Sequence, residues 1–206
     1  MLKIWGRPNS INVQKVMWCV GELGLEHERI DLGREFGSTR QDWYLAMNPN
    51  GLIPTIDDDG FVLWESNAIV RYLAEKYGLG GLCPKPFEER ADADRWMEWH
   101  VTTIQPQMHP IFWGLVRTPP ERRNTAAIEA ATEQLGQTFA LLDWHLEGRS
   151  FMLGESLTMA DIPLGASVYR WNALTVKRPR HANLRAWYER LCEREAFRRH
   201  VMIPLS

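Results

Sequence analysis

Ser10 and Asn12 stand close together where a short alternating stretch gives way to helical spacing. A hydroxyl and a carboxamide can both donate hydrogen bonds, and the N-terminus of a helix carries partial positive charge. Both features lower the pKa of a thiol, so this position suits the stabilisation of a thiolate. The structural alternative is that Asn9, Ser10 or Asn12 simply caps the helix.

Two further clusters suit a peptide-like ligand. Ile53-Pro54 lies where a loop enters a strand, and a cis bond there would turn the Ile53 N–H and C=O outward, ready to pair with an extended peptide. Glu65-Ser66 opens a helix whose free N–H groups suit a ligand carboxylate, while Glu65 could pair with an amine. The ordinary explanations are a trans proline at an edge strand and a helix cap at Ser66 or Asn67. All three clusters together favour the functional interpretation.

Composition excludes several classes of function. The 206 residues are 45% hydrophobic and 24% charged, as in a folded globular protein, and a net charge of −2 gives no basic footprint for nucleic acid. No apolar run reaches membrane-spanning length and the start lacks a signal peptide, so we expect a cytoplasmic protein outside the membrane. The three cysteines form no Cys-x-x-Cys pair and the six histidines are never closer than nine residues, so no metal site is predicted.

The first third of the chain predicts a small α/β domain of order βαβαββα. Its elements are a strand over residues 2–5, a helix from Val13 to about Gly24, a strand over 27–32, a short helix over 43–47, a hairpin of 53–56 with 61–64, and a helix from Glu65. A Gly- and Pro-rich stretch over 78–86 reads as a linker. We therefore place one domain at residues 1–79 and a second at 86–206.

Helical spacing dominates the second part. It predicts a long helix over 87–116 bent near Pro106 and Pro110, a helix from Thr118 to His145, a helix capped by Thr158 with Asp161, and last helices over 179–191 and from Glu195 onward. The second domain is therefore expected to be all-helical.

The whole chain resembles the cytosolic glutathione S-transferases, and the bacterial and theta-like types in particular. Four segments carry the resemblance: residues 10–15, 48–54 (Asn-Pro-Asn-Gly-Leu-Ile-Pro), 65–69 (Glu-Ser-Asn-Ala-Ile) and the capping box at 158–161. The resemblance implies a thioredoxin-like N-terminal domain with Pro54 in cis, followed by the helical domain. It also implies a homodimer with two glutathione sites, glutathione as co-substrate and no metal.

The resemblance also implies roles for single residues. Ile53, ahead of Pro54, would hold the cysteinyl backbone of glutathione, Glu65 and Ser66 the γ-glutamyl amine and carboxylate, and Thr39 the glycyl end. Leu52 replaces the lysine of many relatives, and Arg40 is the candidate substitute. Ser10 matches the hydroxyl of the serine and threonine types, and Asn12 matches an asparagine used by some bacterial members. Either could activate the thiol.

The second substrate would be a small apolar electrophile. Candidate walls for its pocket are Met108, His109, Phe112 and Trp113, with Trp5 or Trp171 nearby; packing between domains explains the same residues equally well. A glutathione-dependent disulfide reductase or peroxidase would use the same thiolate. A binding protein without turnover is the alternative outside the enzymes.

Overall fold

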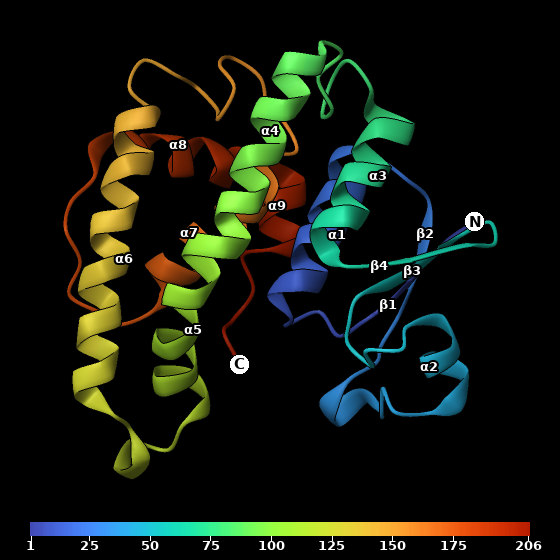
Figure 1. Cartoon of the computed structure of the whole chain (residues 1–206), viewed down its shortest axis with the longest axis horizontal. Coiled ribbons are helices and arrows are strands. Elements are labelled where there is room, and N and C mark those ends of the chain that lie inside the picture. The colour runs from blue at the N-terminus through green and yellow to red at the C-terminus, as the bar shows by residue number, and fades with distance from the viewer.

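The computed structural model describes residues 1–206 and has two parts lying side by side (Figure 1). The first part follows the predicted βαβαββα order, and the second is helical. The elements of the first part are β1 (Leu2–Trp5), α1 (Ile11–Glu22), β2 (His27–Ile30), the 3₁₀ turn η1 (Arg34–Phe36), α2 (Asp42–Met47), β3 (Thr55–Asp58), β4 (Phe61–Trp64) and α3 (Ser66–Gly78).

The four strands form one mixed sheet in the order β2-β1-β3-β4. β1 pairs parallel with β2 and antiparallel with β3, and β3 and β4 form the predicted hairpin. Because side chains alternate along a strand, Leu2 and Ile4 enter the main core with α1 and α3, whereas Trp5 packs on the other face with Tyr44 of α2.

The register of the sheet brings three loops to one edge. Trp5 pairs with Thr55, and Thr55 pairs with Trp64. The chain after β1, the chain before β3 and the chain after β4 therefore meet at the same end of the sheet. These three segments carry the three clusters that the sequence singled out.

The helical part begins with one long helical run that passes both prolines. It consists of α4 (Phe87–Trp99), the π turn η2 (His100–Ile104), α5 (Gln105–Phe112) and the π turn η3 (Trp113–Arg117). A proline lacks the N–H of the α-helical ladder, and π turns are a usual way to accommodate the break. Figure 1 shows that α5 does not continue straight along α4, and Pro106 lies in the first turn of α5, where a bend was expected.

The remaining helices are α6 (Thr125–His145), α7 (Asp161–Ala173), α8 (Ala182–Glu193) and α9 (Glu195–His200). α6 starts later than predicted, because the two prolines after Thr118 form only the 3₁₀ turn η4 (Pro120–Arg122), and Asn124 provides the cap by accepting a hydrogen bond from the Ala127 N–H at 3.1 Å. α8 also starts at Ala182 rather than near Pro179.

The prediction that Thr158 caps α7 is wrong. The residue before the helix is Ala160, which makes no side-chain cap, and the Thr158 hydroxyl donates to the Asp161 carboxylate at 3.2 Å. The hydroxyl therefore serves the carboxylate rather than the free N–H groups of the helix. The Asp161 half of the motif does form, since this carboxylate accepts from the Thr158 N–H at 2.8 Å.

Helix α1 joins the two parts. It packs against α3 beside the sheet and against α7 and α9 of the helical part. One core of 41 buried residues runs through both parts, with Trp18 of α1 fully buried within it. None of the helices combines the length and the apolar character needed to cross a membrane.

Candidate functional site

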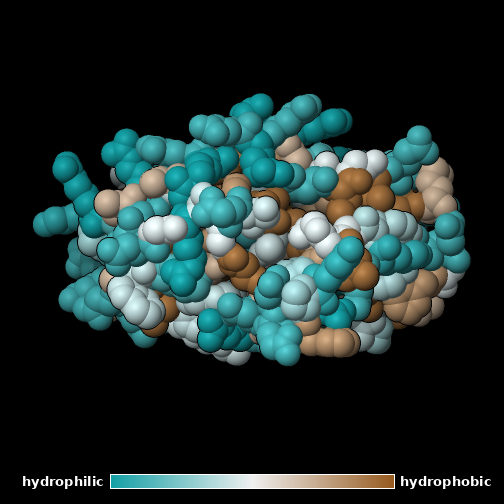
Figure 2. All heavy atoms as spheres, turned by 90° about the horizontal axis from the view of Figure 1, so that it is seen from above, coloured by the Kyte–Doolittle hydropathy of each residue, from teal (hydrophilic) through white to brown (hydrophobic).

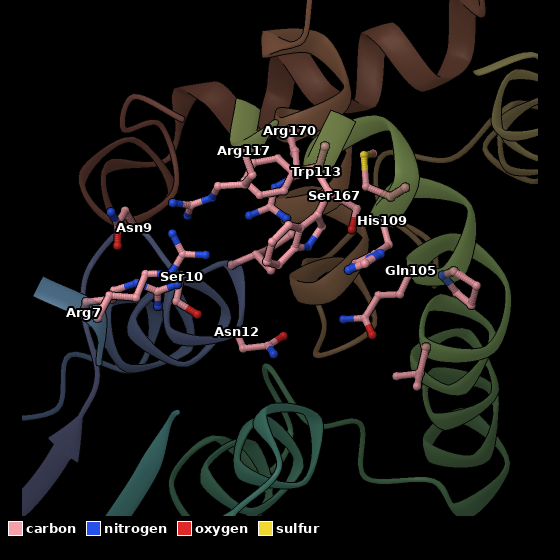
Figure 3. Close-up of a pocket in the computed structure, with 16 residues that line it drawn as sticks. Arg7, Asn9, Ser10, Asn12, Gln105, His109, Trp113, Arg117, Ser167 and Arg170 are labelled. Carbon is pink, nitrogen blue, oxygen red and sulfur yellow. The ribbon is translucent and has the colours of Figure 1, made fainter. Parts of the chain in front are cut away.

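A cleft of about 440 Å³ lies between the start of α1 and the α5 and α7 side of the helical part (Figure 3). Ser10 and Asn12 line it from the N-terminal part, and His109, Phe112 and Trp113 line it from the helical part. The structure thus brings together six of the residues that the sequence proposed, these five and Met108, although they come from segments almost one hundred residues apart. The lining contains no Asp or Glu.

Ser10 and Asn12 are both free to meet a ligand. Ser10 is the N-cap residue of α1, but its side chain makes no capping hydrogen bond. Asn12 lines the cleft, its Nδ2 donor takes part in no side-chain hydrogen bond of the chain, and its Oδ1 acceptor is buried without a partner. The first turn of α1 also leaves backbone N–H groups without helical acceptors. The capping explanation of these residues therefore does not hold, and the donors that could stabilise an anion remain available.

The loop before β3 reaches this edge with a defined shape. The Ile53–Pro54 bond is cis, as predicted. The Tyr44 hydroxyl donates to the Leu52 carbonyl at 2.6 Å, and the Asn48 amide donates to the same carbonyl at 2.8 Å. These bonds fix the loop, while the Ile53 N–H and C=O find no partner within the chain.

Glu65 precedes α3 in an unusual backbone conformation. Its φ of 71° and ψ of 109° are unfavourable for a residue with a side chain, and its carboxylate does not cap the helix. Such conformations cost of order 1–3 kcal/mol and cluster at ligand sites. Ser66 follows as the first residue of α3 and is buried.

Two buried polar groups fix α3 in place behind Glu65. Lys15 of α1 donates to Asn67 Oδ1 at 3.0 Å, and Asn67 Nδ2 donates to the Met97 carbonyl at 3.0 Å. Burial lowers the pKa of Lys15 to about 7, and the negative charge of Glu65 opposes this shift. The Asn67 side chain is therefore used in tertiary contacts and does not cap α3.

Thr39 and Arg40 lie in the segment before α2, outside the cleft lining. Thr39 lies in a turn before α2, which begins at Asp42. The Arg40 guanidinium lies over Gly51, since a Cβ built there would be 3.0 Å from Arg40 Nη1. Leu52 is 62% exposed. Thr39, Arg40 and Leu52 are outside the cleft lining, as are Ile53, Pro54, Glu65 and Ser66.

The apolar wall of the cleft comes from α5 and η3. Phe112 and Met108 are buried, whereas Trp113 is 46% exposed and its ring centroid lies 5.4 Å from that of His109. Trp5 does not belong to this wall, because β1 directs its side chain to the face of the sheet opposite the main core, where it packs against Tyr44.

Sequence reasoning missed four arginines that line the cleft. They are Arg7, after β1, Arg34 in η1, Arg117 at the end of η3 and Arg170 in α7. The Arg170 guanidinium lies over the Phe112 ring at 3.7 Å from its centroid. Only Arg7 could have been suspected, because it precedes Ser10 in the same loop; the other three reach the cleft through tertiary packing.

Comparison with family models identifies the class. Residues 1–75 match the glutathione S-transferase N-terminal domain, and residues 125–190 match the glutathione S-transferase C-terminal domain. The chain belongs to the glutathione S-transferase family, with a thioredoxin-like N-terminal domain and a helical C-terminal domain.

Individual relatives agree over the full length. The chain is 45% identical to Glutathione S-transferase GstB of Escherichia coli, covering 100% of both chains, and 32% identical to Glutathione S-transferase 3 of Zea mays, covering 99% of this chain and 95% of the relative. The crystal structure of the theta class glutathione S-transferase from Xanthomonas axonopodis pv. citri with glutathione bound superposes with a TM-score of 0.95, at 44% identity over 100% of this chain and 99% of that one. These relatives place the chain with the bacterial, theta-like members.

Proposed function

We propose that the protein is a cytoplasmic glutathione transferase that converts the glutathione thiol to a thiolate and transfers an alkyl or aryl group to it. The thiolate sulfur forms a bond to the electrophilic carbon, the leaving group departs with its electron pair, and the thiol proton passes to solvent. The observation that carries this proposal is the pair Ser10 and Asn12, which face the cleft at the start of α1 without partners in the chain.

Glutathione would lie along the sheet edge beside that pair. The free N–H and C=O of Ile53, ahead of cis Pro54, would pair with the cysteinyl backbone, as an added strand pairs with a sheet edge. Glu65 and Ser66 would hold the γ-glutamyl amine and carboxylate, the latter at the N-terminus of α3. Thr39, with Arg40, would contact the glycyl end.

The available donors are sufficient for thiol activation. A thiol has an ordinary pKa of about 8.5, and lowering it by about two units takes roughly 2.7 kcal/mol. One hydrogen bond to a charged group contributes about 1.5–3 kcal/mol, and a helix N-terminus about 0.3–1 kcal/mol more. One side-chain donor together with the start of α1 is therefore enough, and no metal is required for this step.

The electrophile would lie between this thiolate and the wall formed by His109, Phe112 and Trp113. We further propose that the protein is a homodimer in which the N-terminal domain of one chain packs against the helical domain of the other. Figure 2 shows separate hydrophobic patches on the molecular surface, and Phe61, Trp64 and Phe87 are among the large apolar residues that are exposed. Sedimentation at micromolar concentration tests the dimer, and a monomer would contradict it.

The sharpest test of the proposed chemistry distinguishes Ser10 from Asn12. Removing the side chain that activates the thiol should raise the pKa of bound glutathione by about one to two units, which lowers the rate at neutral pH by roughly ten- to a hundredfold. The thiolate absorbance of bound glutathione, titrated against pH, measures this in Ser10→Ala and Asn12→Ala. Glutathione affinity should change little in either variant. If neither variant shifts the titration, backbone N–H groups activate the thiol and both side-chain roles are wrong.

A further inference from the structure

The four arginines of the cleft form no ion pair with a carboxylate of the chain. Arg7, Arg34, Arg117 and Arg170 converge on one cavity, and none of them takes part in an ion pair. The Nε atoms of Arg7, Arg117 and Arg170 are buried and have no hydrogen-bond partner. Buried charges are normally paired, because an unpaired one loses its hydration without compensation. The cleft therefore offers several guanidinium groups in need of an acceptor.

The arginines of the cleft also repel one another. Burial, and then repulsion from Arg34 and Arg117, lowers the pKa of Arg7, and burial followed by repulsion from Arg117 and Arg7 lowers that of Arg170 to about 10. Glu35 opposes the shift at Arg7 and Arg117, but it is exposed and does not line the cleft. An anion bound in the cleft would relieve the repulsion and satisfy the unpaired Nε groups together.

The position of two arginines assigns them to the second substrate. Figure 3 shows Arg117 and Arg170 reaching into the space across from Ser10 and Asn12. Arg117 and Arg170 also lie at the Phe112 ring, at 5.6 and 3.7 Å from its centroid, so the apolar wall and the cationic groups occupy the same side of the cleft. The residues expected to hold the γ-glutamyl end and the cysteinyl backbone, Glu65 and Ile53, are outside this lining.

The geometry points to electrophiles that carry an anionic group, a carboxylate above all, beside an apolar or aromatic body. The guanidinium fork matches a carboxylate with two parallel hydrogen bonds, and Phe112 and Trp113 supply surface for a flat ring. This inference rests on the proposed glutathione transfer and narrows its substrate class from apolar electrophiles in general to anionic ones. The anionic group would position the reacting carbon and would not itself react.

A matched pair of aryl chlorides tests the inference. In 4-chloro-3-nitrobenzoate and 4-chloro-3-nitrobenzamide the same ring carbon is attacked, the C–S bond forms, the C–Cl bond breaks and chloride leaves with the electron pair. Each kcat/KM is divided by the uncatalysed rate of the same compound with glutathione. We expect the protein to prefer the benzoate by at least about tenfold, the effect of one charged hydrogen bond. Arg117→Gln and Arg170→Gln should each remove most of this preference and leave the benzamide rate little changed.

The controls separate this inference from the transfer chemistry. Arg199→Gln removes an exposed positive charge from α9, outside the cleft, and should leave the preference intact. Arg117→Lys keeps the positive charge but lacks the forked guanidinium, so it should retain part of the preference for the benzoate. Equal losses of kcat/KM on both compounds would overturn the inference, because the arginines would then stabilise the transition state that both reactions share. A raised KM for glutathione in the arginine variants would also overturn it, because the arginines would then bind glutathione.

Binding of both compounds without glutathione, measured by calorimetry, provides the second readout. Tighter binding of the benzoate that Arg117→Gln abolishes supports the anion site even if no product forms, in which case the proposed transfer fails by itself. Turnover of both compounds with no preference in rate or binding leaves the transfer intact and overturns the anion site.

Discussion

The N-termini of α3 and α7 look alike in sequence but differ in structure. Each combines a hydroxyl residue with a carboxylate residue, Glu65 with Ser66 at α3 and Thr158 with Asp161 at α7. At α7 the buried Asp161 carboxylate accepts hydrogen bonds from Met152 N–H, Thr158 N–H and Trp187 Nε1–H at 2.8–2.9 Å. At α3 the Glu65 carboxylate is exposed, it caps nothing, and its backbone has a positive φ. A fully bonded start stabilises the fold, whereas a strained and unpaired one is available to a ligand.

The largest effect is expected from Asp161→Ala. Burial raises the pKa of this carboxyl to about 6, so it is ionised at neutral pH and acts as the common acceptor of its neighbours. Its removal leaves buried donors without partners, which costs about 3–5 kcal/mol. The free energy of unfolding, measured in urea, should fall by that amount, while the glutathione KM of the remaining folded protein stays within about twofold. An unchanged unfolding midpoint would mean that the hydrogen bonds of Asp161 at the start of α7 do not stabilise the fold.

The sequence predicted the α3 side of this comparison better than the α7 side. The Ser10, Ile53 and Glu65 clusters are short segments, and strand pairing alone brings them together, so their neighbourhood follows from element order. The role of Asp161 depends on Trp187, which lies on another helix. Arg34, Arg117 and Arg170 reach the cleft by packing over long distances, and no local spacing could indicate that. Trp5 was placed wrongly because strand alternation does not say which face a ligand uses.

The next largest effect is expected at Glu65, where two variants separate the loss of the carboxylate from the strain of the backbone. Glu65→Ala and Glu65→Gly both remove the carboxylate and should raise the glutathione KM by roughly ten- to a hundredfold, the effect of losing a charged hydrogen bond. Glycine tolerates a positive φ and alanine does not, so Glu65→Gly should be more stable than Glu65→Ala by about 1 kcal/mol. Urea unfolding and glutathione kinetics on the same samples measure both quantities. Equal stability of the two variants would mean that no strain is stored at α3, and an unchanged KM would mean that Glu65 does not hold glutathione.

The smallest effects are expected from removing one hydroxyl at each helix start, and these two substitutions are the most similar pair. The Thr158 hydroxyl donates to Asp161 at 3.2 Å, but the shorter bond from the Thr158 N–H remains in Thr158→Val, so the free energy of unfolding should fall by less than about 1 kcal/mol. Valine keeps the shape of threonine, and the glutathione KM should not change.

Ser66→Ala should give the opposite pattern. Ser66 is the first residue of α3, and no hydrogen bond within the chain depends on its hydroxyl, so stability should hold. Glutathione loses a hydrogen bond to its γ-glutamyl carboxylate, and its KM rises several-fold. Unfolding midpoints and KM values for the two variants, measured side by side, decide the matter. If Ser66→Ala lowers the midpoint more than Thr158→Val does and leaves KM alone, the start of α3 is a structural cap as well, and its strained Glu65 needs a different explanation.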